Sequence, residues 1–325
     1  MTGTNASASA TSIPHEPHAA HGTKAIVAAL LANSGIAIAK FIGFLLTRSA
    51  SMLAESVHSL ADSANQGLLL LGAKQAKRDQ DERHQFGYGM VRYFWSFVVA
   101  LILFSLGSLF ALYEGVSKLR HPHHLDSPGI AVAILSVAVV LEAFSFRTAV
   151  VESRPLKGDQ SWWSFIRNAK VPELPVVLLE DTGALVGLLL ALGGVGMAQI
   201  TDNSNWDAYS TISIGVLLGI IAVILIVEMR SLLLGESASA RDADALQSAI
   251  QSSPHVRHLI HARTMHIGPD SVLVGAKIEL DPSLSFEQVT EAIDETEARI
   301  RAAVPTAHVI YLEPAIFNPS RKDGA

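Results

Sequence analysis

The sequence predicts an α-helical membrane protein with six transmembrane helices followed by a small α+β domain. Half of the 325 residues are hydrophobic and only 17% are charged, which is less charge than a soluble chain of this length usually carries. Apolar stretches long enough to cross a bilayer recur along the first two thirds of the chain. They cover roughly residues 24–46, 51–73, 93–116, 128–146, 172–200 and 209–234.

The loops between these stretches differ in charge and predict the orientation of the chain. Basic residues gather in the loops after the second and fourth stretches: Lys74, Lys77, Arg78, Arg83, Arg92, Arg147, Arg154, Lys157, Arg167 and Lys170. The basic side of a membrane protein normally faces the cytoplasm, so both termini are expected there. The predicted location is a bacterial inner (plasma) membrane. Trp162 and Trp163 predict an interfacial amphipathic turn.

The composition becomes soluble from about Glu236 onward. Residues 242–253 predict an amphipathic helix, and residues 258–268 and 271–280 predict two strands around a "GPDS" turn. A helix over residues 285–304 is expected, capped by Ser285 with Gln288 at its third position. A last strand over 307–315 completes a small domain with an open-faced antiparallel sheet.

These patterns divide the chain into four parts. The expected boundaries are a disordered N-terminal tail at 1–23, a six-helix membrane domain at 24–235, a C-terminal domain at 236–317 and a short tail at 318–325.

The second apolar stretch contains "LAESVHSLADSAN", which places two carboxylates and an imidazole within a membrane span. Glu55, His58 and Asp62 are separated by three and four residues, so a helix presents them on one face. A charge at the bilayer centre costs at least about 2.5–3.5 kcal/mol, and such residues are functional candidates by default. An imidazole and a carboxylate one turn apart are natural ligands for a divalent metal.

The fifth stretch contains "LLEDTGALVG", in which Glu180 and Asp181 have no basic neighbour in sequence. A bound cation or a proton would supply the missing positive charge. The alternative is that these polar groups only join helices through hydrogen bonds. Lys40 in the first stretch either neutralises Glu142 in the fourth or extends outward to the membrane surface.

Several motifs, in this order of spans, resemble the cation diffusion facilitator family of divalent-metal/proton antiporters. They are "SASMLAESVHSLADSAN", "FGYGMVRYFWS" and "EDTGALVG", and together they look most like the zinc transporter nine subgroup. The resemblance covers nearly the whole chain after the N-terminal tail. It implies a ferredoxin-like fold for the C-terminal domain, a homodimer formed through that domain, and alternating access with proton exchange.

Carried over by position, the resemblance implies that His58, Asp62 and Asp181 are metal ligands. The family commonly has a histidine four residues before the last of these, where this chain has Val177. Glu180 lies about 60° around the helix from that position. It is therefore the candidate fourth ligand, with water as the alternative.

Two residues depart from the family pattern. Glu55 stands where Asp is more usual, and Asn65 stands where a small residue is more usual. Both are candidate accessory residues of the metal site.

The predicted function is export of Zn²⁺ from the cytoplasm in exchange for H⁺, because zinc binding requires deprotonated ligands. The oxygen-rich ligand set leaves Mn²⁺, Fe²⁺ and Co²⁺ as alternatives. The metal is a substrate and not a cofactor, the other expected partners are protons and the lipid bilayer, and no nucleic acid is expected.

Two functions of a different class are weighed against transport. A membrane metal sensor or scaffold is one alternative, although a scaffold has no need of costly ligands in the bilayer. The sequence has no His-Glu-x-x-His motif, so an intramembrane metalloprotease, and with it an enzyme, is not expected.

The histidines of the C-terminal domain are either regulatory metal ligands or solvated side chains. The second interpretation is preferred for His255, His258, His261, His266 and His308.

Overall fold

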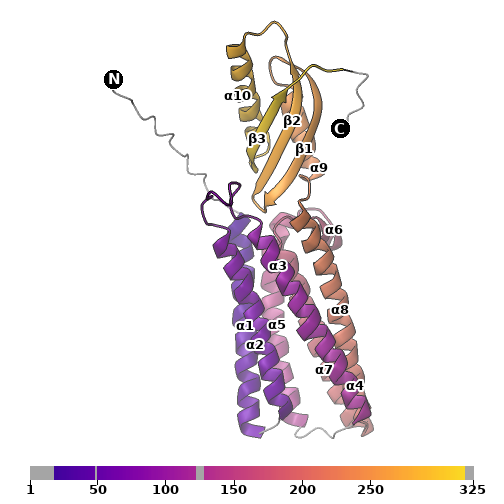
Figure 1. Ribbon diagram of the computed structural model, residues 1–325. Helices are drawn as coiled ribbons and strands as arrows, with labels where there is room; N and C mark the ends of the chain where they lie inside the picture. The colour runs from indigo at the N-terminus through magenta and orange to yellow at the C-terminus, as the bar shows by residue number, and fades with distance from the viewer. Residues whose placement is uncertain (1–17, 48–49, 122–127, 319–325) are drawn as a thin grey trace, which may run out of the picture.

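The computed structural model describes residues 18–47, 50–121 and 128–318 of the chain. Within these ranges the structure does not describe some side chains, namely those of residues 18–22, 44, 46–47, 50–58, 61, 128 and 130. The predicted tails therefore lie largely outside it. A long helical bundle carries a small α+β domain at one end (Figure 1).

The described part of the bundle contains five long helices and four shorter helical elements, three of which follow one another without a break. They are α1 (His18–Thr47), α2 (Ala50–Gln75), α3 (Val91–Ile102), η1 (Leu103–Leu109), α4 (Phe110–Arg120), α5 (Pro128–Lys157), α6 (Trp162–Asn168), α7 (Glu173–Thr201) and α8 (Asn205–Leu234). The C-terminal domain consists of α9 (Ala240–Gln251), β1 (Val256–Gly268), β2 (Ser271–Leu280), α10 (Phe286–Ala303) and β3 (Ala307–Pro314).

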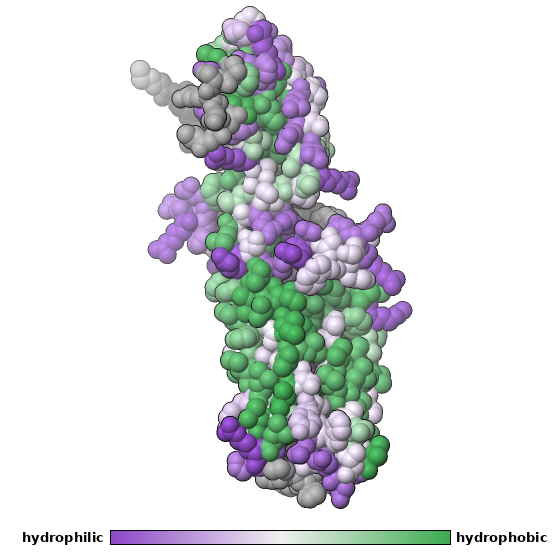
Figure 2. All heavy atoms as spheres, turned by 90° about the vertical axis from the view of Figure 1, so that its right-hand side faces the viewer, coloured by the Kyte–Doolittle hydropathy of each residue, from purple (hydrophilic) through white to green (hydrophobic). Residues whose placement is uncertain are grey.

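Five spans of the described chain are long and apolar enough to cross a membrane: 23–43, 91–120, 131–157, 173–201 and 205–234. The remaining predicted span, 51–73, falls on α2, which packs beside α1. The side chains of the first part of α2 are outside the description, so the count of six spans stays a prediction. On the face that Figure 2 shows, a hydrophobic band covers the bundle between two more hydrophilic ends, as expected of a chain that crosses a bilayer.

The third span is one continuous rod with a widened turn in its middle. Its central segment, η1, is a π-helix that joins α3 to α4. Such wide turns occur mostly as single insertions in α-helices, frequently at functional sites. The apolar pattern of the sequence does not distinguish this turn from an ordinary helix.

Small residues let α4 and α8 approach closely. A Cβ atom at Gly115 would lie 2.6 Å from Cγ1 of Ile212, and one at Gly215 would lie 2.8 Å from Cγ of Leu112. Membrane helices pack through such small residues because lipid supplies no hydrophobic drive for their association.

The sheet of the C-terminal domain has the order β1-β2-β3, and it corrects one expectation. β1 and β2 form the predicted antiparallel hairpin, whereas β2 and β3 pair in parallel. The predicted all-antiparallel sheet is therefore wrong, because α10 crosses over between β2 and β3 and returns the chain in the same direction. The predicted capping box of α10 is confirmed. The hydroxyl of Ser285 accepts from the backbone N–H of Gln288, and the side-chain oxygen of Gln288 accepts from the backbone N–H of Ser285.

Two ion pairs of Arg92, one buried and one partly exposed, hold the tip of this hairpin against the bundle. Nε and Nη2 of Arg92 donate to the two carboxylate oxygens of Glu173 at 2.5 and 2.8 Å. Nη1 of Arg92 donates to Oδ2 of Asp270, in the β1–β2 turn, at 3.1 Å. A guanidinium is suited to such a fork, because its donors match a carboxylate in geometry. One side chain thus joins α3, α7 and the C-terminal domain.

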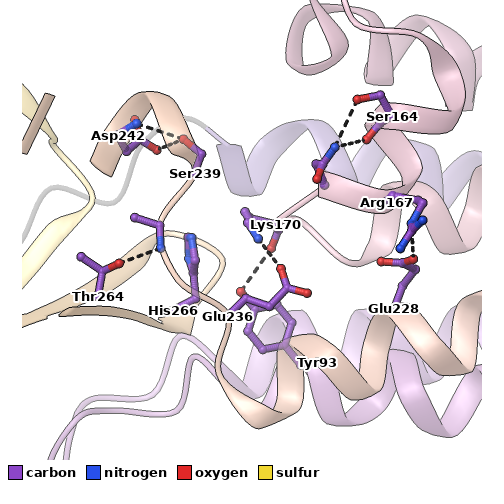
Figure 3. A network of polar contacts seen from close by, with 12 residues as sticks. Tyr93, Ser164, Arg167, Lys170, Glu228, Glu236, Ser239, Asp242, Thr264 and His266 are labelled. Atoms are coloured by element: carbon purple, nitrogen blue, oxygen red, sulfur yellow. Dashed lines mark hydrogen bonds and ion pairs between the residues drawn. The ribbon is translucent and has the colours of Figure 1, made fainter. Parts of the chain in front are cut away.

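A second polar contact lies beside the first. Lys170, before α7, pairs with Glu236, after α8. Figure 3 shows both next to His266. His266 is 4% exposed, so the expectation that all five domain histidines are solvated is wrong for this one. Burial lowers the pKa of His266, and the nearby Lys170 lowers it further, so the imidazole is neutral at pH 7.

The joint between bundle and domain also depends on a close backbone contact at Gly89. A Cβ atom there would lie 2.6 Å from the carbonyl oxygen of Ile267 and 2.9 Å from Cα of Gly268. We expect Gly89→Ala to lower the free energy of unfolding by about 1–3 kcal/mol, as overpacking does. Thermal unfolding in detergent, with limited proteolysis at the joint, measures the effect.

Gly193→Ala is the matched control for this substitution. A Cβ at Gly193 meets nothing within 4 Å, and alanine in a helix is favoured over glycine by about 1 kcal/mol. Equal unfolding temperatures for wild type and Gly89→Ala would contradict the assignment of this contact.

Candidate metal site

Three carboxylates from three different helices line one cavity inside the bundle. Asp62 on α2, Glu142 on α5 and Glu180 on α7 face a space of about 220 Å³. Its described lining on α7 begins at Glu180 and ends at Ala191. The cavity therefore extends from the carboxylates toward the end of the bundle that lies away from the C-terminal domain.

A lysine lies at the far end of the cavity. Nζ of Lys118 is 3.4 Å from Oε1 of Glu114 and 2.9 Å from Oδ2 of Asp207. All three residues line the cavity. The ammonium group bridges α4 and α8 at this end.

The adjacent carboxylates on α7 face different neighbours. Successive residues of a helix point about 100° apart, and Glu180 accordingly faces α2 while Asp181 faces α5. Gln66 donates through Nε2 to Oε2 of Glu180 at 2.7 Å, and Asn65 donates through Nδ2 to Oε1 at 3.4 Å. Ser145 donates through Oγ to Oδ2 of Asp181 at 2.7 Å. Each carboxylate thus has a donor from another helix.

The amides of Asn65 and Gln66 bring unsatisfied oxygens to the same place. Both residues are buried, yet neither Oδ1 of Asn65 nor Oε1 of Gln66 has a hydrogen-bond partner in the described part of the chain. Buried oxygens are normally paired, and an exception calls for a water or an ion. The N–H groups of both amides are turned to Glu180, so each leaves its oxygen for another donor or a cation.

Not all of the predicted site residues can be placed. Glu55 and His58 belong to α2, but their side chains are outside the described residues. Asp62 is half-buried and Asp181 is buried. Among the described side chains, no group of three or more His, Asp or Glu residues lies close enough to hold a metal ion. The described carboxylates are therefore not gathered around one point.

The position expected to carry a histidine lies outside the cavity. Val177 is completely buried in the apolar core of the bundle, next to Leu174 and Leu178. The lining of the cavity described on α7 starts three residues later, at Glu180. A histidine at position 177 would thus meet hydrocarbon in this conformation.

Sequence reasoning did not single out Gln66 or Ser145. A signal was present for both, because Gln66 follows Asp62 by four residues and Ser145 follows Glu142 by three. These spacings place each donor on the same helix face as a carboxylate. Neutral polar residues are common between membrane helices, so the spacing alone is a weak signal.

These features define a multi-pass membrane protein that holds acidic groups around a cavity within its apolar bundle. A family model described as "Cation efflux transmembrane domain" matches residues 26–234, and "Cation efflux protein, cytoplasmic domain" matches residues 238–315. The chain therefore belongs to the cation efflux, or cation diffusion facilitator, family of divalent-metal transporters. Members of this family are transporters and not enzymes.

Two curated relatives illustrate this similarity. The human "Proton-coupled zinc antiporter SLC30A9, mitochondrial" is 30% identical over 286 residues, which cover 84% of this chain and 50% of that one. The chain thus spans about half the length of that relative. "Magnetosome protein MamB" of Paramagnetospirillum magneticum is 26% identical over 272 residues, covering 82% of this chain and 85% of that one.

Among solved structures, the chain is similar to the MamM CTD. The identity is 20%, the similarity covers 23% of this chain and 92% of that one, and the TM-score is 0.22.

The hydrogen bond from Gln66 to Glu180 allows a test by mutation. Removing one partner of a buried hydrogen bond leaves the other unsatisfied at a cost of about 1–3 kcal/mol, so we expect Gln66→Leu to destabilise the metal-free protein by about that amount. Gln75→Leu is the control on the same helix: it removes the 2.9 Å bond that Nε1 of Trp95 donates to Oε1 of Gln75, and should cost about 0.5–1.5 kcal/mol. Thermal unfolding with a chelator compares the two, and a smaller loss for Gln66→Leu would contradict the prediction.

Proposed function

We propose that the protein exports Zn²⁺ from the cytoplasm in exchange for H⁺ by alternating access. The observation that carries the proposal is the cavity that Asp62, Glu142 and Glu180 line within an apolar bundle, in a chain of the cation efflux family. Carboxylates in a bilayer are costly, and a transported cation explains why three helices bring them to one space.

The proposed ligands are His58, Asp62, Asp181 and Glu180. Asn65 donates to Glu180, which supports an accessory, orienting role for this amide. Glu55 is proposed as an accessory residue only because it shares a helix face with His58 and Asp62. The described carboxylates do not converge on one point, and α2 already contacts α7 through Gln66 and Glu180, so the proposal requires the acidic side chains to reorient when metal binds.

Exchange for protons follows from the chemistry of the ligands. Carboxylates and imidazole bind zinc only when deprotonated, so binding releases protons and protonation releases metal. The cavity supports such a cycle, because it extends from the carboxylates away from the C-terminal domain, where one of the two accesses is needed. On the other side of the carboxylates the bundle is closed by apolar packing around Tyr93, Leu174 and Val177.

Zinc is proposed ahead of Mn²⁺, Fe²⁺ and Co²⁺. The imidazole of His58 favours zinc, whereas a ligand set rich in oxygen shifts the preference toward the others. The name of the human relative, a proton-coupled zinc antiporter, supports zinc as the first choice.

The assembly and the location are part of the same proposal. Homodimerisation through the C-terminal domain is supported by the family model that matches it. We place the protein in a bacterial inner membrane with both termini in the cytoplasm, which the basic loops support. The metal-sensor or scaffold alternative differs from this proposal in one measurable way, since it requires no metal flux.

The transport role of Glu180 can be tested in reconstituted vesicles. We expect Glu180→Gln to lower zinc uptake at least about tenfold, because the amide is a poorer metal ligand than the carboxylate. Glu228→Gln is the control: this carboxylate is also in a span, but it pairs with Arg167. Near-wild-type uptake by Glu180→Gln would exclude a ligand role, and absence of uptake by the wild type would favour the sensor.

Coupling to protons is tested by the driving force. Zinc should accumulate in proteoliposomes when a pH gradient is imposed. This accumulation should stop when an ionophore collapses the gradient. Asp181→Asn provides the control for leak, because it removes a proposed ligand. Equal zinc uptake with and without the pH gradient would show that the transporter is not a proton antiporter.

A further inference from the structure

Two buried charged residues in the bundle have no part in the ligand set proposed above. Lys40 on α1 is 7% exposed and Glu142 on α5 is 2% exposed. Both line the cavity that Asp62 and Glu180 also line. A lysine in this position is costly in a membrane protein unless the surroundings use its charge.

The helices bring the two side chains toward the same level. α1 and α5 touch at Gly35, where a Cβ atom would lie 3.3 Å from Cδ1 of Leu141, next to Glu142. Lys40 is five residues further along α1, a rise of about 7.5 Å. Side chains on a helix tilt back toward its N-terminus, so the ammonium group of Lys40 extends back toward the carboxylate of Glu142.

The charges around this point are unequal. Three carboxylates, those of Asp62, Glu142 and Glu180, line the cavity together with the ammonium-bearing Lys40. Of the described residues that line the cavity, Lys118 also carries a positive charge, but it is paired with Glu114 and Asp207 at the far end. The positive charge near the acidic cluster therefore comes from Lys40.

We propose that Lys40 is a resident counter-cation of the metal site, and that an entering divalent ion must displace it. Without metal, its ammonium group offsets the mutual repulsion of the carboxylates. With metal, it repels the bound ion and keeps the affinity low enough for release, since conduction requires binding that is favourable but not too tight. This role rests on the proposed function, because it concerns the same site.

The same arrangement provides selection by charge. A divalent ion brings twice the charge of the ammonium group and interacts more strongly with the same carboxylates. A sodium ion brings no more charge than Lys40, and the lysine is tethered, so its effective concentration at the site is high. Lys40 thus excludes monovalent cations while a divalent ion can replace it.

Zinc titration of the purified full chain in detergent tests this role. We expect Lys40→Met to lower the Kd for Zn²⁺ at least about tenfold and to make binding sensitive to Na⁺, which the wild type resists. Lys40→Arg keeps the charge and should retain the wild-type Kd and the resistance to Na⁺. In vesicles, Lys40→Met should lower KM and kcat together, because metal that binds more tightly is released more slowly.

Lys24→Met is the matched control on the same helix, since this lysine is largely exposed and lies near Glu152 at the other end of α1. If Lys40→Met does not fold, Lys40→Gln takes its place. An unchanged or higher Kd together with resistance to Na⁺ in the uncharged variant would overturn the proposal. Failure of the proposed function gives a different result. In that case the wild type either does not bind zinc or binds it equally well after Asp181→Asn.

Discussion

The arrangement of the bundle depends on the cost of burying carboxylates in an apolar environment. Glu180 is held by Gln66, Asp181 by Ser145 and Glu173 by Arg92, and each donor comes from a different element than its acceptor. An unpartnered charge in this environment would cost several kcal/mol. These hydrogen bonds therefore specify which helix faces meet, in a setting where apolar packing alone distinguishes poorly between orientations.

Helix α7 links two of these contacts. Its first residue, Glu173, lies in the ion pair with Arg92 and Asp270 at the C-terminal domain, and Glu180 lines the cavity two turns further on. A helix is stiff over such a distance, so a displacement of the domain relative to α3 moves the carboxylates as well. The C-terminal domain and the acidic cavity thus share one rigid element, which supports the alternating access proposed above.

Much of this structure was predictable because it follows from local patterns. Apolar length and acidic residues within it identify spans and candidate ligands such as Asp62 and Glu180. The capping box at Ser285 is likewise a short-range signal. The parallel pairing of β2 with β3 was missed, because strand direction depends on the path of α10 and not on residues within the strands. His266 was misjudged for a similar reason: its burial comes from the contact between domain and bundle.

The sequence by itself determined the class of the protein, its apolar spans and the residue types that could bind a divalent cation. These properties are encoded in composition and helical spacing, which involve neighbours along the chain. Only the tertiary structure decided that Val177 is packed in the core, that Gln66 and Ser145 hold the carboxylates and that Lys40 lines the same cavity as Glu142. Contacts between distant helices depend on their rotation and depth, and the pattern of any single helix leaves both undetermined.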